Sequence, residues 1–389
     1  MFRNVFRSAS NFATRVGHSD KVAETLWNGK RCDQLLWEKL KVKSCRSYTT
    51  VSSAKHKGSS YLTWSRLHSY RKSANENSST AIGLGTGLMA FSLFGKKDDE
   101  ETEEDVLITT IKWAKLHAHK GELEKSDKKY HDALSMVQSR GRSGEWDRSK
   151  VIQAQTYLFD SMANLALQAM QLQKAEQLFK ETMVGLLEMG REKTDDAMVE
   201  ISLKLAVIYG MMDKHMEAEA GYKFCIDSLQ GRLAKDMKKG LDFVEENTLA
   251  LLGMSLNSYA RYMIVQKKYD SALQNLERSM EIAKNVLGAD HHQVSVLYSD
   301  AATINSMKGD YQAAKEYIDK AVELGKKTDS PDLAMYVCNQ GVVELNLGRG
   351  DVAKKLCSDA FRMAQKLDDK ITMKEARVCL ENVKKEEKK

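Results

Sequence analysis

One helix-pair pattern, clearest between Val294 and Lys327, constrains what this chain can fold into. Its first half, VSVLYSDAATINSM, has Ala301 and Ala302 at its centre, and its second half, QAAKEYIDKAVELGKK, carries apolar residues at helical spacing. Between the halves, Gly309 tolerates the positive φ angle of a tight turn. Small residues let paired helices cross closely, whereas larger apolar residues fill the space beside the crossing. Such a pair cannot bury both of its faces alone, so a stable fold requires the pattern to recur.

The pattern recurs six times, with the central small residues of successive copies 39 to 54 residues apart. These central residues are Ala114, Ala163, Ala206, Ala260, Ala302 and Gly341. The arrangement of small and aromatic positions is the signature of the tetratricopeptide repeat, which has an ideal length of about 34 residues. The longer intervals predict longer helices or insertions, the largest being charged helical turns at 227–248.

We therefore predict an all-α fold, a tetratricopeptide repeat α-solenoid of about six helix pairs over residues 106–389. The stretch from Asp368 to Lys389 is expected to form a C-terminal capping helix that closes the last apolar face. The second and fourth copies depart from the pattern, because Thr182 and Ser279 stand at the last small position, where alanine is expected.

The first 97 residues are strongly basic, whereas the rest of the chain is mildly acidic. Residues 1–97 contain 17 Lys or Arg and 5 Asp or Glu, whereas the remainder contains 43 and 49. A basic N-terminal segment followed by a mildly acidic remainder indicates targeting rather than nucleic-acid binding. Residues 1–48 have no acidic residue before Asp20 and place Phe2 and Val5 on one side of a helix that also carries arginines. This pattern predicts a mitochondrial transit peptide, the alternative being a generic basic tail.

Three short segments connect this presequence to the repeats. Residues 49–80 are rich in Ser, Lys and Asn and predict a disordered linker. Residues 81–95, AIGLGTGLMAFSLFG, are uncharged and predict a short membrane segment, or otherwise an apolar linker or interfacial anchor. Residues 96–105 form an acidic hinge. The charge bias predicts that the basic side of this segment lies in the matrix and that the repeats lie across the membrane, in the intermembrane space.

The sequence carries no motif of an enzyme. Nucleophile elbows, phosphate-binding loops and zinc-ligand spacings are absent from it. We therefore predict no catalytic residue, cofactor, metal site or small-molecule substrate. Cys225 and Cys357 fall at repeat core positions, so we expect buried thiols there, and we expect no disulfide framework.

Binding of another protein remains as the expected function. The first helix of each pair lines the concave face of such an array, and its inward positions form the candidate groove. These positions are Tyr157, Asp160, Asn164, Leu203, Val207, Met211, Met254, Asn257, Arg261, Ile264 and Met307. This apolar, Met-containing set suits a hydrophobic or helical partner segment, although roughly half of the set is expected to pack against neighbouring repeats. Polar changes at Tyr157, Met211 and Arg261 are expected to leave folding nearly unaltered.

Two local features point to an alternative function, that of a soluble adaptor. The run from Leu287 to Val294, LGADHHQV, resembles the linker between the 42-residue repeats of kinesin light chains, in which histidine serves as a turn and capping residue. The interval between Ala260 and Ala302 is likewise 42 residues. A chaperone adaptor would need a carboxylate clamp of Lys, Asn and Arg, but only Asn164 is in place and Asp160 replaces a lysine.

The repeats as a whole resemble the tetratricopeptide repeat protein 19 family. The resemblance covers about residues 106–385 and is specific in DSMANLALQAMQLQKAEQLFKETM (160–183), VEISLKLAVIYG (199–210) and GYKFCIDSL (221–229). It implies a mitochondrial inner-membrane protein that binds respiratory complex III and helps to clear fragments of its Rieske iron–sulfur subunit. The family supplies no catalytic residue to transfer.

Overall fold

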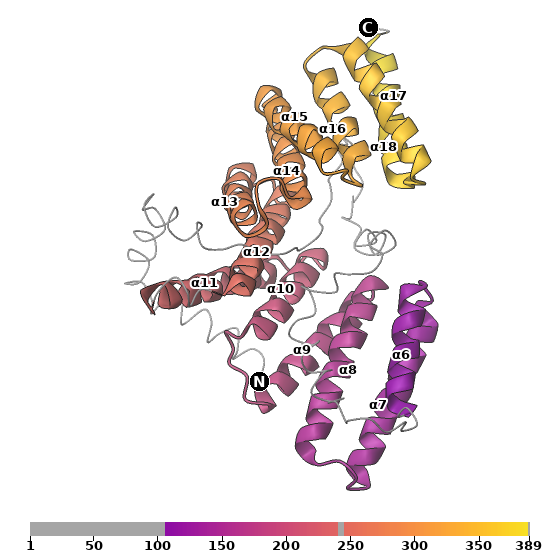
Figure 1. The fold of residues 1–389 in the computed structure, drawn as a ribbon, viewed down its shortest axis with the longest axis vertical. Helices are drawn as coiled ribbons and strands as arrows, with labels where there is room; N and C mark the ends of the chain where they lie inside the picture. The colour runs from indigo at the N-terminus through magenta and orange to yellow at the C-terminus, as the bar shows by residue number, and fades with distance from the viewer. Residues whose placement is uncertain (1–105, 240–244, 388–389) are drawn as a thin grey trace. The chain divides into compact units, whose positions relative to one another are not determined.

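The computed structural model describes residues 106–239 and 245–387, so the predicted transit peptide, linker, membrane segment and acidic hinge lie outside the described residues. Every regular element within the two described ranges is an α-helix (Figure 1). No helix in these ranges combines the length and apolar character needed to span a membrane. The chain divides between Arg232 and Leu233 into two compact units, each with its own packing.

The first unit contains two complete helix pairs and most of a third. Its helices are α6 (Val106–His119), α7 (Leu123–Arg142), α8 (Arg148–Gln168), α9 (Leu172–Glu188), α10 (Asp196–Met211) and the start of α11 (His215–Lys239). α11 is 25 residues long, so the stretch expected to form charged helical turns is helical at least to Lys239.

The second unit begins in the last residues of α11 and contains three further pairs and a final single helix. Its other helices are α12 (Glu246–Val265), α13 (Tyr269–Leu287), α14 (His292–Lys308), α15 (Tyr311–Lys327), α16 (Leu333–Asn346), α17 (Gly350–Lys366) and α18 (Lys370–Glu386). The described residues thus hold six helix pairs followed by one capping helix, which confirms the predicted repeat architecture.

Within each pair, the central small residue is buried where the two helices cross. In the third pair, a Cβ atom added to Gly221 of α11 would lie 2.8 Å from the Cβ of Ala206 on α10. Real Cβ atoms do not approach this closely, so a larger residue at either position would force the helices apart. The alanine and glycine positions of the repeat therefore set the distance between paired helices.

At two of the small positions the side chain is polar, and it forms a hydrogen bond with the backbone of the other helix in its pair. The Cys225 thiol donates to the carbonyl oxygen of Val199 at 3.5 Å, and the Ser279 hydroxyl donates to the carbonyl oxygen of Gly253 at 2.8 Å. These hydrogen bonds offset the cost of burying a polar atom beside the helix crossing. Cys225 is the buried thiol predicted from the sequence, and its burial raises the pKa of the thiol.

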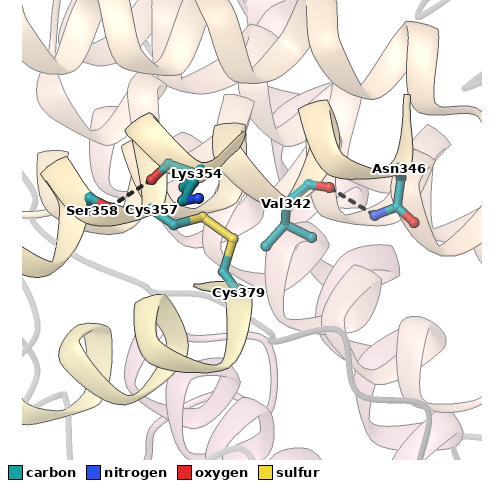
Figure 2. Close-up of a disulfide and its surroundings, with 6 residues drawn as sticks. All are labelled: Val342, Asn346, Lys354, Cys357, Ser358 and Cys379. Atoms are coloured by element: carbon teal, nitrogen blue, oxygen red, sulfur yellow. Dashed lines mark hydrogen bonds between the residues drawn. A yellow bond between two sulfur atoms is a disulfide. The ribbon is translucent and has the colours of Figure 1, made fainter. Parts of the chain in front are cut away.

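Cys357 is buried as expected, but the expectation that it carries a thiol is wrong, because its sulfur is bonded to that of Cys379 (Figure 2). The Cα atoms of the two residues are 6.2 Å apart, although 22 positions separate them in the sequence. Spacing within the chain does not reveal this pairing, which arises because α18 packs across α17. The covalent bond joins the capping helix to the last helix pair.

The turn inside every pair contains one residue with a positive φ angle. Glycine occupies this position in three of the pairs, as Gly121, Gly309 and Gly348. In the other three pairs the corresponding residues are Met170, Asp213 and Lys267, with φ angles of 59°, 58° and 59°. A side chain in this left-handed region crowds the following carbonyl group, so these three turns hold a conformation that glycine would adopt more easily.

We predict opposite stability effects for two matched substitutions in these turns. Gly309→Ala should lower the free energy of unfolding by about 1 kcal/mol, because alanine resists the positive φ angle. Lys267→Gly should raise it by about 0.5 kcal/mol, because relief of backbone crowding exceeds the entropy that glycine adds to the unfolded chain. Denaturant unfolding of the purified variants measures both changes, and equal effects of the same sign would contradict the assignment of the turns.

Candidate protein-binding surface

All eleven predicted groove residues lie on the first helices of their pairs, namely α8, α10, α12 and α14. Five of these residues are buried, namely Tyr157, Asp160, Leu203, Asn257 and Ile264. The other six are partly exposed, namely Asn164, Val207, Met211, Met254, Arg261 and Met307. Contact between any of these residues and a partner stays a prediction. The contacts made within each unit show which side chains are already engaged by the fold.

Tyr157 belongs to the core of the first unit. It packs with Leu107 and Ile111 of α6, and only 4% of its surface is exposed. The Lys115 ammonium group lies 5.3 Å from the centre of the Tyr157 ring. A polar residue at position 157 would remove core packing, so the expectation that such a change leaves folding unaltered is wrong.

Asp160 forms a charged cluster between α8 and α10. Asn164 donates a hydrogen bond of 3.0 Å to one oxygen of the Asp160 carboxylate, and Lys204 Nζ lies 4.0 Å from the other oxygen. Lys204 also forms an ion pair of 2.9 Å with Glu200 on its own helix. Burial raises the pKa of Asp160, although the charge of Lys204 acts in the opposite direction. The cluster therefore links two first helices within the first unit.

Arg261 makes the corresponding link in the second unit. Its Nη2 and Nε atoms donate to the same oxygen of Asp300 on α14, at 2.7 and 3.3 Å. Burial raises the pKa of Asp300, and Arg261 opposes this shift by charge and hydrogen bonding. Arg261 is therefore needed to compensate a buried carboxylate, which corrects the expectation that changing it would hardly affect folding.

A second polar contact continues from α14 to the next first helix. The Asn339 amide of α16 donates to the Ser299 hydroxyl of α14 at 3.2 Å. Farther along α16, the buried carboxylate of Glu344 accepts from Lys315 at 2.7 Å and lies 2.8 Å from Arg349. Polar contacts thus join α12, α14 and α16 beside the alanine crossings.

Sequence reasoning missed Lys204 and Asp300, the partners of Asp160 and Arg261. Both lie about one repeat interval downstream of the residue that they pair with. Opposite charges about one repeat interval apart on successive first helices were therefore the signal that could have identified them. Because these charges are engaged within the fold, Met211, Met254 and Met307 are the better candidates for partner contact.

The linker before α14 has the structure that its histidine predicts. Gly288 has a φ angle of +94°, and His291 caps α14 by accepting a hydrogen bond from the backbone N–H of Gln293 at 3.1 Å. The adjacent ring of His292 packs against His291 edge to face. Within residues 106–239 and 245–387, no group of three or more His, Cys, Asp or Glu side chains has a metal-binding arrangement.

Comparison with known proteins identifies the family. The tetratricopeptide repeat family model matches residues 251–327. The mouse protein named "Tetratricopeptide repeat protein 19, mitochondrial" is 36% identical over 286 residues, which cover 73% of this chain and 76% of the mouse protein. The chain belongs to the tetratricopeptide repeat protein 19 family.

Two further relatives of this family extend the comparison. The human protein of the same name is 36% identical over 285 residues, covering 72% of this chain and 73% of that protein. The homologue from Drosophila melanogaster is 29% identical over 298 residues, which cover 75% of this chain and 76% of the homologue. All three relatives are named as mitochondrial.

Solved structures share the fold at low sequence identity. BtubC (BKLC) from P. vanneervenii has a TM-score of 0.51 at 16% identity, covering 63% of this chain and 92% of BtubC. Aspartyl phosphate phosphatase F from Bacillus subtilis has a TM-score of 0.50 at 16% identity, and the match covers 79% of this chain and 80% of the phosphatase. Such distant likeness shows a helical-repeat fold and nothing about function. The match to the tetratricopeptide repeat family model is what indicates binding of other proteins through the helix surfaces.

We predict that Arg261→Ala lowers the free energy of unfolding by about 3 kcal/mol at neutral pH, because it leaves the buried Asp300 carboxylate without its cation. The loss should shrink as the pH falls, since the raised pKa of Asp300 lets the carboxyl group become neutral by binding a proton. Denaturant unfolding at several pH values measures this dependence.

The control removes a cation from an exposed ion pair. Lys308→Ala breaks the contact with Asp270, whose side chain is 84% exposed, and should change the free energy by less than about 0.5 kcal/mol. A second substitution, Asp300→Asn, should recover much of the loss in the Arg261→Ala background. Equal losses for Arg261→Ala and Lys308→Ala would contradict a role for Arg261 in compensating buried charge.

Proposed function

We propose that this chain is a non-enzymatic mitochondrial scaffold that binds respiratory complex III and supports its assembly and maintenance. The observation that carries the proposal is membership of the tetratricopeptide repeat protein 19 family over 73% of the chain. The role at complex III, including clearance of Rieske iron–sulfur subunit fragments, is what the resemblance to that family implies. The repeat fold supports a binding function, because its helices present side chains for contact with a partner.

The partly exposed methionines of the first helices would contact an apolar segment of the partner. Met211 is the last residue of α10, and Met307 lies one residue before the end of α14. Methionine has a flexible, polarisable side chain that adapts to different apolar partners. This property suits fragments of a subunit, which expose apolar residues that an assembled complex would bury.

The proposal includes a membrane anchor and an orientation. Residues 81–95 would hold the protein in the inner membrane, and the acidic hinge at 96–105 would separate the anchor from the repeats. The basic residues before the anchor favour the matrix side, which places the repeats in the intermembrane space.

The alternative is a soluble adaptor of the kinesin-light-chain or chaperone kind. The observation that favours it is the linker from Leu287 to Val294, with His291 as its helix cap. Cell fractionation separates the two proposals. The scaffold should be found in mitochondria and resist carbonate extraction, whereas an adaptor should remain in the cytosol at full length.

We predict that Met211→Glu and Met307→Glu reduce the recovery of complex III subunits by about tenfold or more, because each places a charge against an apolar partner segment. The measurement is affinity purification of the tagged full chain from detergent-solubilised mitochondria, followed by quantification of the bound subunits. Thermal unfolding of both variants establishes that they remain folded.

Met216→Glu is the matched control, since Met216 is 85% exposed and lies on α11, the second helix of the same pair. This control should capture complex III as well as the unaltered chain does. Absence of complex III subunits from the unaltered sample would refute the proposed partner. Capture by folded Met211→Glu and Met307→Glu at the level of the control would refute the proposed contact surface.

A further inference from the structure

The strongest feature outside the candidate surface is the disulfide at the C-terminal end of the repeats. Cys357 lies in the middle of α17 and Cys379 in the middle of α18, and their side chains point toward each other between the two helices (Figure 2). Both residues are buried, with 0% and 2% of their surfaces exposed. Burial makes a disulfide slow to react with soluble thiols, as expected of a bond that serves the structure.

A third helix packs against this bond. A Cβ atom added to Gly341 of α16 would lie 2.5 Å from the Cys357 sulfur, so α16 approaches the disulfide through a glycine. Figure 1 shows α16, α17 and α18 alongside one another at the end of the second unit. The bond therefore lies where the last three helices of the array meet.

The capping helix buries no large side chain completely. Its buried side chains are Thr372, Ala376, Cys379 and Val383, and all four are small or β-branched. Its other face carries Ile371 and Val378, which are 40% and 38% exposed. Because hydrophobic stabilisation scales with buried apolar area, these small side chains contribute less to holding α18 than large ones would. The disulfide adds a covalent attachment to this packing.

We propose that Cys357 and Cys379 are a site of thiol oxidation, at which a disulfide-carrying oxidoreductase completes the fold by fixing α18 on the last helix pair. The inference deepens the proposed placement of the repeats in the intermembrane space, because disulfides persist where thiols are not kept reduced. It does not depend on which complex the protein binds.

The chemistry is a balanced thiol–disulfide exchange. The thiolate of one cysteine attacks the disulfide of the oxidoreductase and forms a mixed disulfide, which releases one thiolate of the oxidoreductase. The thiolate of the other cysteine then attacks the mixed disulfide and releases the second thiolate of the oxidoreductase. The two cysteines lose two electrons and two protons, and the oxidoreductase becomes a dithiol. Because both sulfurs are buried in the folded protein, the exchange must occur before α18 docks.

Cys338 provides an internal reporter of this docking. It lies on α16 as a free thiol, 1% exposed, in the same core cluster as Ala376 of α18. Burial raises its pKa to about 12, so the docked state protects it from alkylating reagents. Release of α18 would expose it.

The first experiment counts thiols in the full chain taken from mitochondria. Proteins are quenched in acid and modified with a maleimide of high mass, with and without prior reduction. Reduction of the unaltered chain should reveal two additional thiols. The difference should disappear in the Cys357→Ala/Cys379→Ala variant and remain in Cys225→Ala, which removes a buried thiol of the first unit. An unaltered chain with equal thiol counts would overturn the proposal.

The second experiment tests the consequence for α18 without relying on a substituted core. Mild reduction of the native protein should raise the alkylation rate of Cys338 by about tenfold or more, because local opening of α18 becomes easier. Cys225, which is distant from α18 in the sequence and belongs to the other unit, should keep its rate. An unchanged Cys338 rate in protein shown to be reduced would overturn the role of the bond in fixing α18.

The third experiment tests the compartment. The repeats fused to a matrix-targeting presequence should arrive with Cys357 and Cys379 reduced, whereas the unaltered protein should carry the bond. Equal oxidation of the two forms would overturn the dependence on compartment. Detection of the disulfide in a chain that captures no complex III would refute the proposed function alone, so the two failures are distinguishable.

Discussion

The close crossing of paired helices at small residues is the constraint on which the rest of this structure depends. Ala114, Ala163, Ala206 and Ala260 have no exposed surface, and Gly221 approaches Ala206 more closely than two Cβ atoms could. This contact sets the spacing within a pair, and the spacing decides which neighbouring side chains can reach one another.

The helix pairs could be predicted from the sequence because the periodic pattern is local and repeated. The positions of Ala302, Gly309 and Ala314 determine a register that also holds in copies with weaker matches. The turns at Met170 and Lys267 show that the register persists where glycine is absent. Packing along the whole pair outweighs the local cost of a positive φ angle at one residue.

Contacts between helices far apart in the sequence could not be predicted in the same way. The pattern placed Asp160 and Arg261 on first helices, but it did not identify Lys204 and Asp300 as their partners. For the same reason the Cys357–Cys379 bond escaped prediction, because a disulfide depends on the crossing geometry of two helices. These contacts stabilise side chains that would otherwise have been candidates for partner binding, and they leave the partly exposed methionines available.

The central claim is that small residues at the helix crossings determine the fold, and a matched pair on α11 tests it most directly. Ala218 has no exposed surface, whereas Ala220 lies two residues farther along the same helix and is exposed. Denaturant unfolding should show that Ala218→Leu lowers the free energy by about 1–3 kcal/mol through overpacking. Ala220→Leu should change it by less than about 0.5 kcal/mol. Equal effects of the two leucines would contradict the claim.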